Sequence, residues 1–542
     1  MSYLLKVEFK EHSSPVVTEL LGERFTDVSG DAQGNNLFLV SGKSEPHLPG
    51  LSAILKSVWQ GVLVKIDGAE VTIYSDPVGS VPVYYTSISS RNTVYISDSA
   101  DQIFSILDKI ELEMVAFWQS VAFETPLGNR TIIAGVYQLN GGQSLRFASD
   151  LDTTIQRYWD WNFRDEVIHN LSFQECIERA SELLESSFNS QLKGCDGPYL
   201  LPISGGLDSR LVTVLASRNL PKDLVQPVTY AYSSRSQEYQ LAKAVCSNLG
   251  LKEPIFHELN STVYKDATEW MPRETGGMVA FFNCHLLDYL RKTDFRGTVL
   301  TSAFSDGLCG YESQDVQGES WENSAKVKQW IRFSKDYGLD EDISCTTMED
   351  LEKLSWEWTR SSISSFDEFL YIVERHSKFH LPLINLWQRF SSTATPFISS
   401  ELFELFFSMR PEFRINKSVE KDVVEYLCPG IADIGSMSSL VLTGRTGSRS
   451  KRLFHRSINF LNVLLRGLGY AEHEIPSSRI TEQLAKALHT ELRADFDAAI
   501  NEMYSRGALS SFQLSKFSKP SLRFNEKLRS QLSILNAFRI FE

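Results

Sequence analysis

Long apolar runs and closely spaced cysteines are both missing from this 542-residue chain. No 18 consecutive residues are apolar, so the sequence predicts no membrane-spanning helix and no membrane partner. The seven cysteines are an odd number, lie far apart and include no CxxC pair. Buried free thiols are therefore a better interpretation than a zinc site or a disulfide framework.

An excess of basic residues is missing as well. Lys and Arg total 54 against 68 Asp and Glu, which gives a formal net charge of -14. An acidic surface repels polyanions, so we expect no nucleic-acid partner, although a local basic patch could still bind phosphate. The opening MSYLLKVEF alternates like a strand and carries charges, which fits neither a secretory signal nor a transit peptide. The expected location is cytoplasmic.

The length is too great for a single hydrophobic core. An expectation of about 100–200 residues per domain gives two to four domains. Hydrophobic residues make up 42% and charged residues 23%, which is typical of a globular protein. The pattern predicts a mixed α/β and α+β chain with two domains and an extension: a layered antiparallel-sheet domain over 1–165, a parallel-sheet domain over 166–440, and a helical C-terminal extension over 441–542.

Short strand-like runs separated by turn residues dominate the first domain. They recur about every ten residues, with Asp-Gly and Asn in the turns, which is typical of antiparallel sheet. The runs lie at residues 36–40, 61–68, 71–75, 83–86 and 94–97.

The stretch LLPISGGLDSR at residues 200–210 changes abruptly from apolar to small and acidic residues, and then continues as a helical pattern. This order predicts a strand, a tight turn and a helix N-terminus. The free backbone N–H groups and the positive helix end at such a turn favour phosphate. Gly205 and Gly206 would let phosphate oxygens approach the main chain, and Ser204 and Ser209 would donate hydroxyl hydrogen bonds.

Two further strands are predicted beside this one. Residues 227–232 are expected to form the next parallel strand, and residues 297–301 lead into SAFSDGLCGY. Asp208 and Asp306 therefore follow neighbouring strands at one edge of the sheet. A hard Mg²⁺ ion prefers carboxylates and bridges phosphate oxygens, so this pair is the candidate metal site.

These motifs resemble those of a known family. SGGLDS resembles the pyrophosphate loop of the ATP-pyrophosphatase superfamily, and SAFSDGLCGY resembles the LSGEGADELFGGY segment of asparagine synthetases. TPFISSELFEL at 395–405 resembles the PFLDxxLVEF element of the same family. DPVGSVPVYY at 76–85 resembles the DPxGxxPLYY element of the N-terminal-nucleophile glutaminase domain of these synthetases. The chain is identified on this basis as asparagine synthetase-like over roughly residues 35–430.

The resemblance implies a site for ATP and Mg²⁺. The residues that match the pyrophosphate loop are Ser204, Gly205, Gly206, Leu207, Asp208 and Ser209. The strand that lies against adenine in the family corresponds to the segment with Tyr230, and the next strand-end loop begins at Ser302. The family also uses a lysine at the start of a later helix to contact phosphates, and Lys421 is expected there. From the residues alone, a solvated surface charge at Lys421 is an equal alternative.

The chain departs from the family at both reaction centres. The family's glutaminases use an N-terminal cysteine as nucleophile, whereas this chain has Ser2 and no cysteine before Cys176. We therefore interpret the first domain as a degenerate glutaminase-like domain kept for folding, docking or partner binding. Ala303 replaces the family's catalytic glutamate, and Gly307 replaces the acidic residue after the second aspartate. Asparagine synthesis itself is consequently in doubt.

The C-terminal extension begins with a basic, Gly/Ser-rich stretch, GRTGSRSKR at residues 444–452. A solvated loop is favoured there over a segment that closes on a phosphate. Residues 453–468, 480–504 and 522–541 are predicted to be helical.

The resemblance implies an ATP-dependent ligase that forms an amide through an acyl-adenylate and releases AMP and pyrophosphate. Asp208 and Asp306 would hold Mg²⁺ with pyrophosphate, and Lys421 would offset the developing charge. The partners would be a carboxylate substrate and either ammonia, from a separate glutaminase or another source, or an amine; a homodimer is compatible with the sequence. The alternatives are a ligase like the β-lactam and lasso-peptide cyclases, and a non-catalytic relative that binds a nucleotide or a partner.

Overall fold

The structure is a computed structural model, and part of the chain is described. The described residues are 4–8, 16–21, 25–27, 36–40, 51, 54–67, 70–88, 93–147, 153–195, 197–313, 320–435, 487–488, 490–518 and 526–541. Ser2, the basic stretch 444–452 and the predicted helix 453–468 lie outside the described residues. Among the helices that are described, none has the length and apolar character needed to span a membrane.

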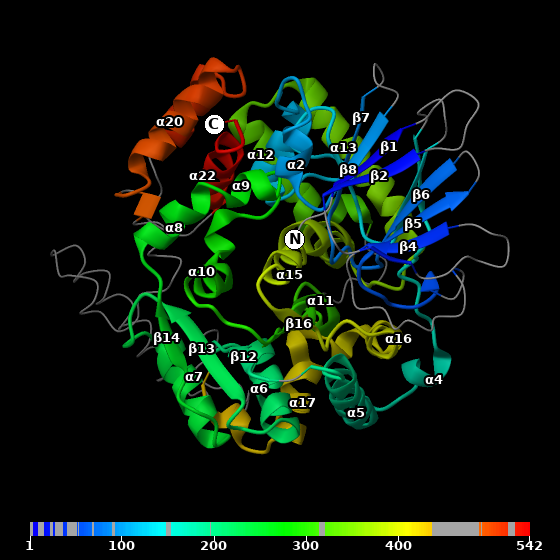
Figure 1. The fold of residues 1–542 in the computed structure, drawn as a ribbon, viewed down its shortest axis with the longest axis vertical. Coiled ribbons are helices and arrows are strands. Elements are labelled where there is room, and N and C mark those ends of the chain that lie inside the picture. The colour runs from blue at the N-terminus through cyan, green and yellow to red at the C-terminus, as the bar shows by residue number, and fades with distance from the viewer. Residues whose placement is uncertain are drawn as a thin grey trace.

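Two antiparallel sheets form the N-terminal region, at the blue end of the chain in Figure 1. The first has the order β2-β1-β8-β7-β9, with bounds Val16–Leu21, Leu4–Glu8, Thr93–Ser97, Val83–Ile88 and Tyr137–Leu139. The second has the order β11-β10-β6-β5-β4-β3, with bounds Thr153–Arg157, Gln143–Phe147, Glu70–Ser75, Val62–Asp67, Asn36–Val40 and Phe25–Asp27. Side chains from both sheets, such as Val7 and Val64, share one buried cluster. The predicted antiparallel sheets are confirmed.

Asp76 organises the turn between β6 and β7. Its carboxylate accepts hydrogen bonds from the backbone N–H groups of Gly61 (3.1 Å), Val78 (3.0 Å) and Ser80 (3.0 Å). The Ser80 hydroxyl donates a further hydrogen bond at 2.6 Å. Burial raises the pKa of Asp76, and these hydrogen bonds oppose that shift. Gly79 has a φ of +71°, which a side chain would strain. The DPVGS element therefore shapes a turn, as the sequence predicts.

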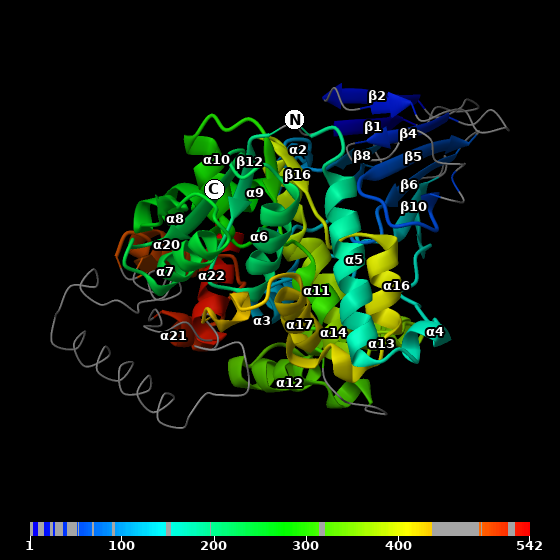
Figure 2. The same cartoon turned by 90° about the horizontal axis from the view of Figure 1, so that it is seen from below.

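A five-stranded parallel sheet forms the centre of the next region. Its order is β14-β13-β12-β15-β16, with bounds Ile255–Glu258, Val225–Ala231, Tyr199–Pro202, Thr298–Leu300 and Ser392–Ala394. All neighbouring strands pair in parallel, which confirms the predicted parallel sheet. Side chains from one face, including Leu200 and Val228, pack with residues of α10, His285–Lys292. On the other face, Leu201 joins the main buried cluster with residues of α5, α6, α7 and α17 (Figure 2).

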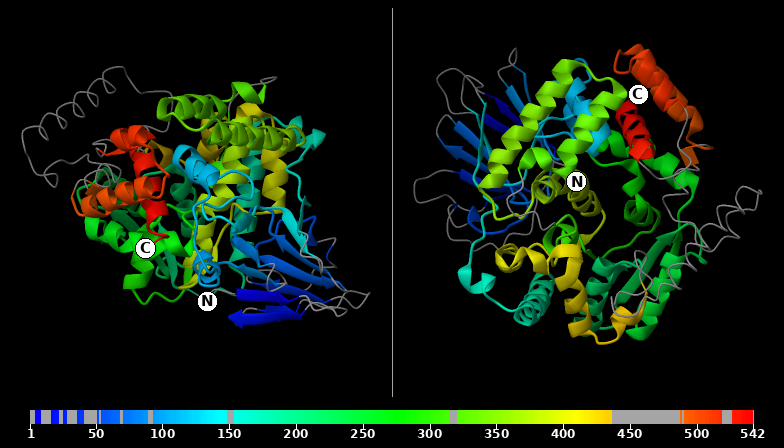
Figure 3. Two further views of the ribbon diagram at one scale, coloured as in Figure 1. Left: turned by 90° about the horizontal axis from the view of Figure 1, so that it is seen from above. Right: turned by 180° about the vertical axis from the view of Figure 1, so that it is seen from behind.

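In Figure 3 the antiparallel sheets lie at one edge of the molecule, and most of the helices lie beside them and around the parallel sheet. Besides α10, the helices described in the first 300 residues are α2 Ala100–Phe104, α3 Met114–Phe123, α4 Glu166–His169, α5 Phe173–Gln191, α6 Leu207–Asn219, α7 Gln237–Asn248, α8 Ser261–Thr268, α9 Met271–Glu274 and η2 Phe281–Asn283. Those that follow are α11 Ser305–Cys309, η3 Trp321–Asn323, α12 Ala325–Tyr337, α13 Glu341–Thr359, α14 Phe366–Phe369, η4 Leu370–His380, α15 Pro382–Trp387, α16 Ser400–Ser408, η5 Pro411–Phe413, η6 Ile415–Lys417, α17 Ser418–Leu427, η7 Ile431–Asp433, α20 Arg493–Ser505, α21 Ser511–Phe517 and α22 Glu526–Phe538. Ser172 and Glu175 form a capping box at the start of α5, which the spacing of the two residues in the sequence indicates.

The π-helix η4 joins the two regions through a buried ion pair. Glu374 accepts hydrogen bonds from the Gly128 backbone N–H (3.0 Å) and the Asn140 amide (2.9 Å), both in the N-terminal region. Lys378 donates to Glu374 at 2.7 Å and to two backbone carbonyls of the N-terminal region. The Lys378 and Glu374 side chains are 0% and 1% exposed. Burial lowers the pKa of Lys378 and raises that of Glu374, while the mutual attraction of the two groups opposes both shifts.

Replacing Lys378 with methionine tests this contact, because it removes one partner and keeps the length of the side chain. Glu374 would stay buried without its cation, so we expect a stability loss of about 3–5 kcal/mol. The measurement is the midpoint of urea unfolding, followed by circular dichroism. The double variant Lys378→Met, Glu374→Gln should recover part of the loss. The control Lys109→Met, at an exposed pair with Glu111, should not move the midpoint. An unchanged midpoint in Lys378→Met would contradict this role.

Candidate active site

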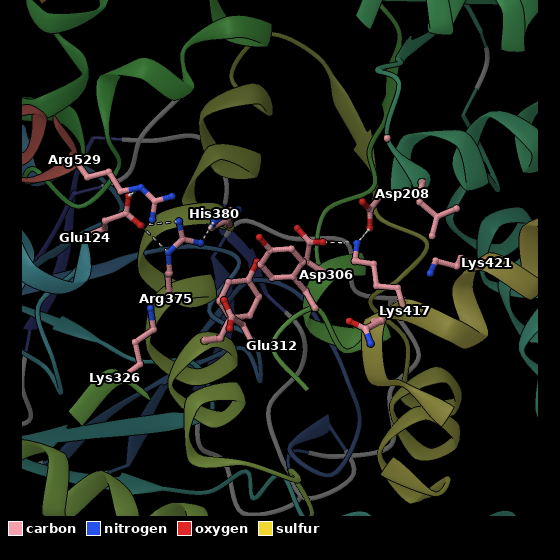
Figure 4. A pocket seen from close by; sticks show the side chains of 15 residues that line it. Glu124, Asp208, Asp306, Glu312, Lys326, Arg375, His380, Lys417, Lys421 and Arg529 are labelled. Atoms are coloured by element: carbon pink, nitrogen blue, oxygen red, sulfur yellow. Dashed lines mark hydrogen bonds and ion pairs between the residues drawn. The ribbon is translucent and has the colours of Figure 1, made fainter. Parts of the chain in front are cut away.

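The loops after β12 and β15 open into one cavity of about 710 Å³ (Figure 4). Strand β12 leads to Asp208 and strand β15 leads to Asp306, because parallel strands direct their carboxyl ends to the same edge. The residues that line the cavity are Glu124, Gly206, Leu207, Asp208, Asp306, Tyr311, Glu312, Lys326, Tyr371, Arg375, His380, Asn416, Lys417, Lys421 and Arg529.

The SGGLDS loop is a strand–turn–helix, as predicted. Helix α6 begins at Leu207 with Gly206 as its N-cap residue. The Ser204 hydroxyl accepts a hydrogen bond from the Gly206 N–H at 3.1 Å, and the Ser209 hydroxyl accepts one from the Ser204 N–H at 3.1 Å. Buried Arg210 donates to the Gly205 carbonyl at 3.4 Å, and burial lowers its pKa to about 10. These contacts fix a loop whose helix N-terminus lines the cavity.

Phe304 sets the position of the second aspartate. It precedes α11 with a φ of 73°, in the left-handed region that a non-glycine residue rarely adopts. Its ring is 2% exposed and packs against Trp161 (centroids 6.0 Å apart) and Phe403 (5.1 Å). This packing holds the strained backbone, so that Asp306 enters the cavity from the first turn of α11.

Lys417 joins the two aspartates. Its ammonium forms ion pairs with Asp208 and Asp306, and it lies 3.4 Å from a carboxylate oxygen of Glu420. The Ser305 hydroxyl donates a further hydrogen bond to Asp208 at 2.6 Å. Figure 4 shows Lys417 reaching between the two carboxylates from the start of α17. Three segments that are distant in sequence therefore meet at one cation.

The charges in this cluster shift one another. Burial disfavours the charged form of Asp208, but the Lys417 ammonium outweighs it and holds the pKa of Asp208 below its ordinary value. Burial, and then the charge of Asp208, raise the pKa of Asp306 and also that of Glu420. Burial alone would lower the pKa of Lys417, yet the three surrounding carboxyl groups raise it. These shifts favour the charged forms of Lys417 and Asp208 and the neutral forms of Asp306 and Glu420.

Backbone strain concentrates at this cavity. Among the described residues, four that are not glycine have a positive φ: Glu124 (68°), Phe304 (73°), Asn416 (55°) and Lys417 (58°). Three of them line the cavity, and Phe304 precedes the helix that carries Asp306. Each such backbone conformation lowers the stability of the fold by on the order of 1–3 kcal/mol and persists only where the surrounding structure enforces it. Such strained residues cluster at functional sites. The strain marks this cavity as the candidate active site.

The predicted residues divide into two groups. Gly206, Leu207, Asp208, Asp306 and Lys421 line the cavity. Ser204, Gly205, Ser209, Tyr230 and Ser302 are not among the lining residues.

The side chain of Tyr230 packs with the sheet face that α10 covers. Its ring lies 6.1 Å from His285 and 6.4 Å from His257, measured between ring centroids. The contact of its strand with adenine stays a prediction.

Lys417 is not among the residues predicted from the sequence. A lysine was expected at the start of a helix and Lys421 was assigned to it, but α17 begins at Ser418, so Lys417 is the lysine at that start. The spacing of buried Val419, Val423 and Val424 could have indicated the earlier start. Lys421 lies one helical turn further along and lines the same cavity, and its contact with phosphate stays a prediction. The other missed residues, Arg375 and Lys326 among them, come from elements far away in sequence.

Comparison with known proteins gives one family. Residues 179–381 match the family model described as asparagine synthase. The matched segment includes the SGGLDS loop and Asp306 and extends through η4. No curated protein matches the chain.

The two lysines of α17 provide a matched test of the cluster. Replacing Lys417 with methionine removes the cation between buried carboxylates, whereas Lys421→Met keeps it. The raised pKa of Lys417 gives stability that is present below its unfolded value of about 10.4, and the lowered pKa of Asp208 gives stability that is present above about 3.9. We therefore expect Lys417→Met to lower the melting temperature most between about pH 5 and 9, and less near pH 3. A loss that is the same at every pH, or equal in Lys421→Met, would contradict the assignment.

Proposed function

Since the chain is asparagine synthetase-like, with a domain of that ATP-dependent amide-forming ligase family at residues 179–381, we propose that it joins a carboxylate to an amine through an acyl-adenylate. The products would be an amide, AMP and pyrophosphate. The observation that carries the proposal is Lys417 between Asp208 and Asp306, beside the N-terminus of α6.

The start of α6 suits the phosphates of ATP. The first turn of a helix has backbone N–H groups without intrahelical partners, and the helix dipole favours negative charge there. Gly206, Leu207 and Asp208 bring this turn to the cavity wall. Gly206 adds no side chain, so a phosphate oxygen can approach the main chain.

A magnesium ion fits the carboxylates of this site. Asp208 and Asp306 pair with the same ammonium, so their oxygens lie within reach of one shared cation. Both oxygens of the adjacent Glu420 are buried and have no hydrogen-bond partner within the described part of the chain. In that part, no group of three His, Cys, Asp or Glu side chains could hold a metal alone. Mg²⁺ held by Asp208 and Asp306 would complete its shell with phosphate oxygens and would neutralise charge on the leaving pyrophosphate.

Lys417 would place a positive charge beside the oxygens on which negative charge develops in the first step of the reaction. A carboxylate oxygen of the substrate attacks the α-phosphorus of ATP, and the bond from that phosphorus to the bridging oxygen of pyrophosphate breaks. Negative charge grows on the departing oxygens during this step. The Lys417 ammonium is fixed beside the head of α6 and would stabilise that charge more than the charge of the ground state.

The second half of the reaction forms the amide. An amine nitrogen attacks the acyl carbon, the bond to the AMP oxygen breaks, and the nitrogen releases a proton. Ala303 offers no group to accept it, and its side chain packs against the main buried cluster. A non-catalytic relative that binds a nucleotide is therefore the second candidate. The strained residues around the cavity favour the ligase, because backbone strain is retained at sites that must hold reacting groups in a fixed arrangement.

The test of the ligase is substrate-dependent exchange of labelled pyrophosphate into ATP by the full chain. We expect exchange with a suitable carboxylate, no exchange in Asp208→Asn, and a loss of about 100- to 1,000-fold in Lys417→Met. Asp223→Asn is the matched control, because Asp223 is exposed and lies before β13, at the opposite edge of the sheet. ATP binding without exchange for any carboxylate would favour the non-catalytic candidate.

Glutamine hydrolysis gives a separate prediction. The chain has no cysteine before Cys176, so no thiol nucleophile is available at its start. We expect no release of glutamate from glutamine above a blank without protein, and amide formation that depends on added ammonia or an amine. Glutamate release that disappears in Ser2→Ala would overturn the interpretation of a degenerate glutaminase-like domain.

A further inference from the structure

Glu312 is a carboxylate of the cavity that the nucleotide role proposed above does not use. Four acidic side chains line the cavity: Glu124, Asp208, Asp306 and Glu312. Glu124 pairs with an arginine, and both aspartates pair with Lys417. Glu312 has no ion pair and no hydrogen bond with any residue of the described part of the chain. Its carboxylate is therefore available to a ligand.

The turn that carries Glu312 is fixed on both sides. Before it, Gly310 has a φ of +81°, and a Cβ at that position would lie 2.8 Å from Arg414. After it, the Ser313 hydroxyl donates a hydrogen bond to Glu368 at 2.6 Å. Arg414 joins the two sides, because it donates to a backbone carbonyl of α11 at 3.0 Å and to Glu368 at 2.6 Å. The Arg414 and Glu368 side chains are 2% and 1% exposed, so this support is buried.

Two consecutive residues, Tyr311 and Glu312, extend from this turn to the cavity wall. The Lys417 ammonium lies 5.8 Å from the centroid of the Tyr311 ring, and the ring of Tyr371 lies 5.7 Å away, between centroids. Burial raises the pKa of Tyr371, and the charge of Asp306 and, to a smaller extent, that of Glu312 add to this shift. Figure 4 shows Glu312 on the side of Asp306 away from Lys417. Glu312 therefore lies near the aspartates but outside their ion pairs.

The other groups of this wall that accept protons at neutral pH are carboxylates and a histidine, and those among the described residues are in use. Glu124 is bound by Arg375, and the His380 ring accepts a hydrogen bond from the same guanidinium at 2.6 Å. Asp208 and Asp306 pair with a lysine and would hold Mg²⁺ in the proposed reaction. A general base must lie within hydrogen-bond reach of the proton that it takes, so the acceptor has to line the cavity.

We propose that the Glu312 carboxylate is the general base of the amide-forming step, which Ala303 cannot serve. The inference rests on the proposed ligase function. The lone pair of an uncharged amine nitrogen forms the bond to the acyl carbon. The bond from that carbon to the AMP oxygen breaks, and its electron pair leaves with AMP. The proton of the nitrogen passes to a Glu312 oxygen and then to water, which the partly exposed side chain can reach.

Separate assays of the two halves of the reaction on the full chain test Glu312→Gln. Exchange of labelled pyrophosphate into ATP reports on the first half, and the wild type is assayed with the standard amino acids and with aliphatic and aromatic carboxylic acids. Amide formation is then measured with each acid that gives exchange, with ammonia, methylamine or hydroxylamine as the amine. We expect Glu312→Gln to keep the exchange rate of the wild type and to lose about 100- to 10,000-fold in kcat for amide formation with ammonia and methylamine. The acyl-adenylate should accumulate in a single turnover of the variant.

Two further variants separate a chemical role from a structural one. Glu312→Asp keeps a carboxylate and should recover part of the lost kcat. Glu322→Gln is the matched control, because Glu322 is exposed and does not line the cavity, and it should behave as the wild type. Hydroxylamine is uncharged at neutral pH and is a strong nucleophile, so its reaction should lose less in Glu312→Gln than that of ammonia. The melting temperature of each variant checks that the fold is kept.

Amide formation at the wild-type rate in Glu312→Gln, with exchange present, would overturn the inference and leave the ligase intact. An equal loss of exchange and of amide formation would overturn it too, because Glu312 would then act before the amide-forming step or in folding. Exchange by the wild type without an amide from any of the three amines would have the same consequence, since a base in this cavity would serve the smallest amines. No exchange with any acid would contradict the ligase itself.

Discussion

The ammonium of Lys417 between Asp208 and Asp306 is the interaction on which the site depends. Without this cation the two half-buried carboxylates would repel each other, and one of them would take up a proton, because burial and mutual repulsion both disfavour their charged forms. The lysine reaches them only through two successive left-handed residues, Asn416 and Lys417. The loops after β12 and β15 are thereby tied to the start of α17, and the geometry of this end of the cavity follows from one charge.

The π-helix η4 links this site to the N-terminal region. Glu374 and Lys378 bind backbone and amide groups of that region, while Tyr371, Arg375 and His380 of the same helix line the cavity. The N-terminal region also contributes Glu124, which fixes Arg375. The N-terminal region therefore has a physical role here, because it completes a wall of the neighbouring cavity.

Within residues 179–381, the departures from the asparagine synthetase pattern lie in one loop. Ala303 and Phe304 stand where the family motif has glutamate and glycine. Phe304 adopts the left-handed backbone that glycine would adopt freely, and its ring is held among Trp161, Phe403 and His376. This combination fits a changed substrate better than a decayed site, since a decayed site would have no reason to retain the strain.

The sequence by itself determined the features that depend on local order. The strand–turn–helix at Ser204–Ser209, the turn at Asp76, the capping box of α5 and the convergence of Asp208 with Asp306 follow from residue patterns and from the rule that parallel strands end at one edge. Only the tertiary structure decided which cation joins the aspartates and which other charged side chains line the cavity. Lys417 depends on two unusual backbone angles, and Lys326, Arg375 and Glu124 meet through packing of elements up to 251 residues apart. Local propensity carries no information about such distant contacts, because they arise only when the whole chain packs.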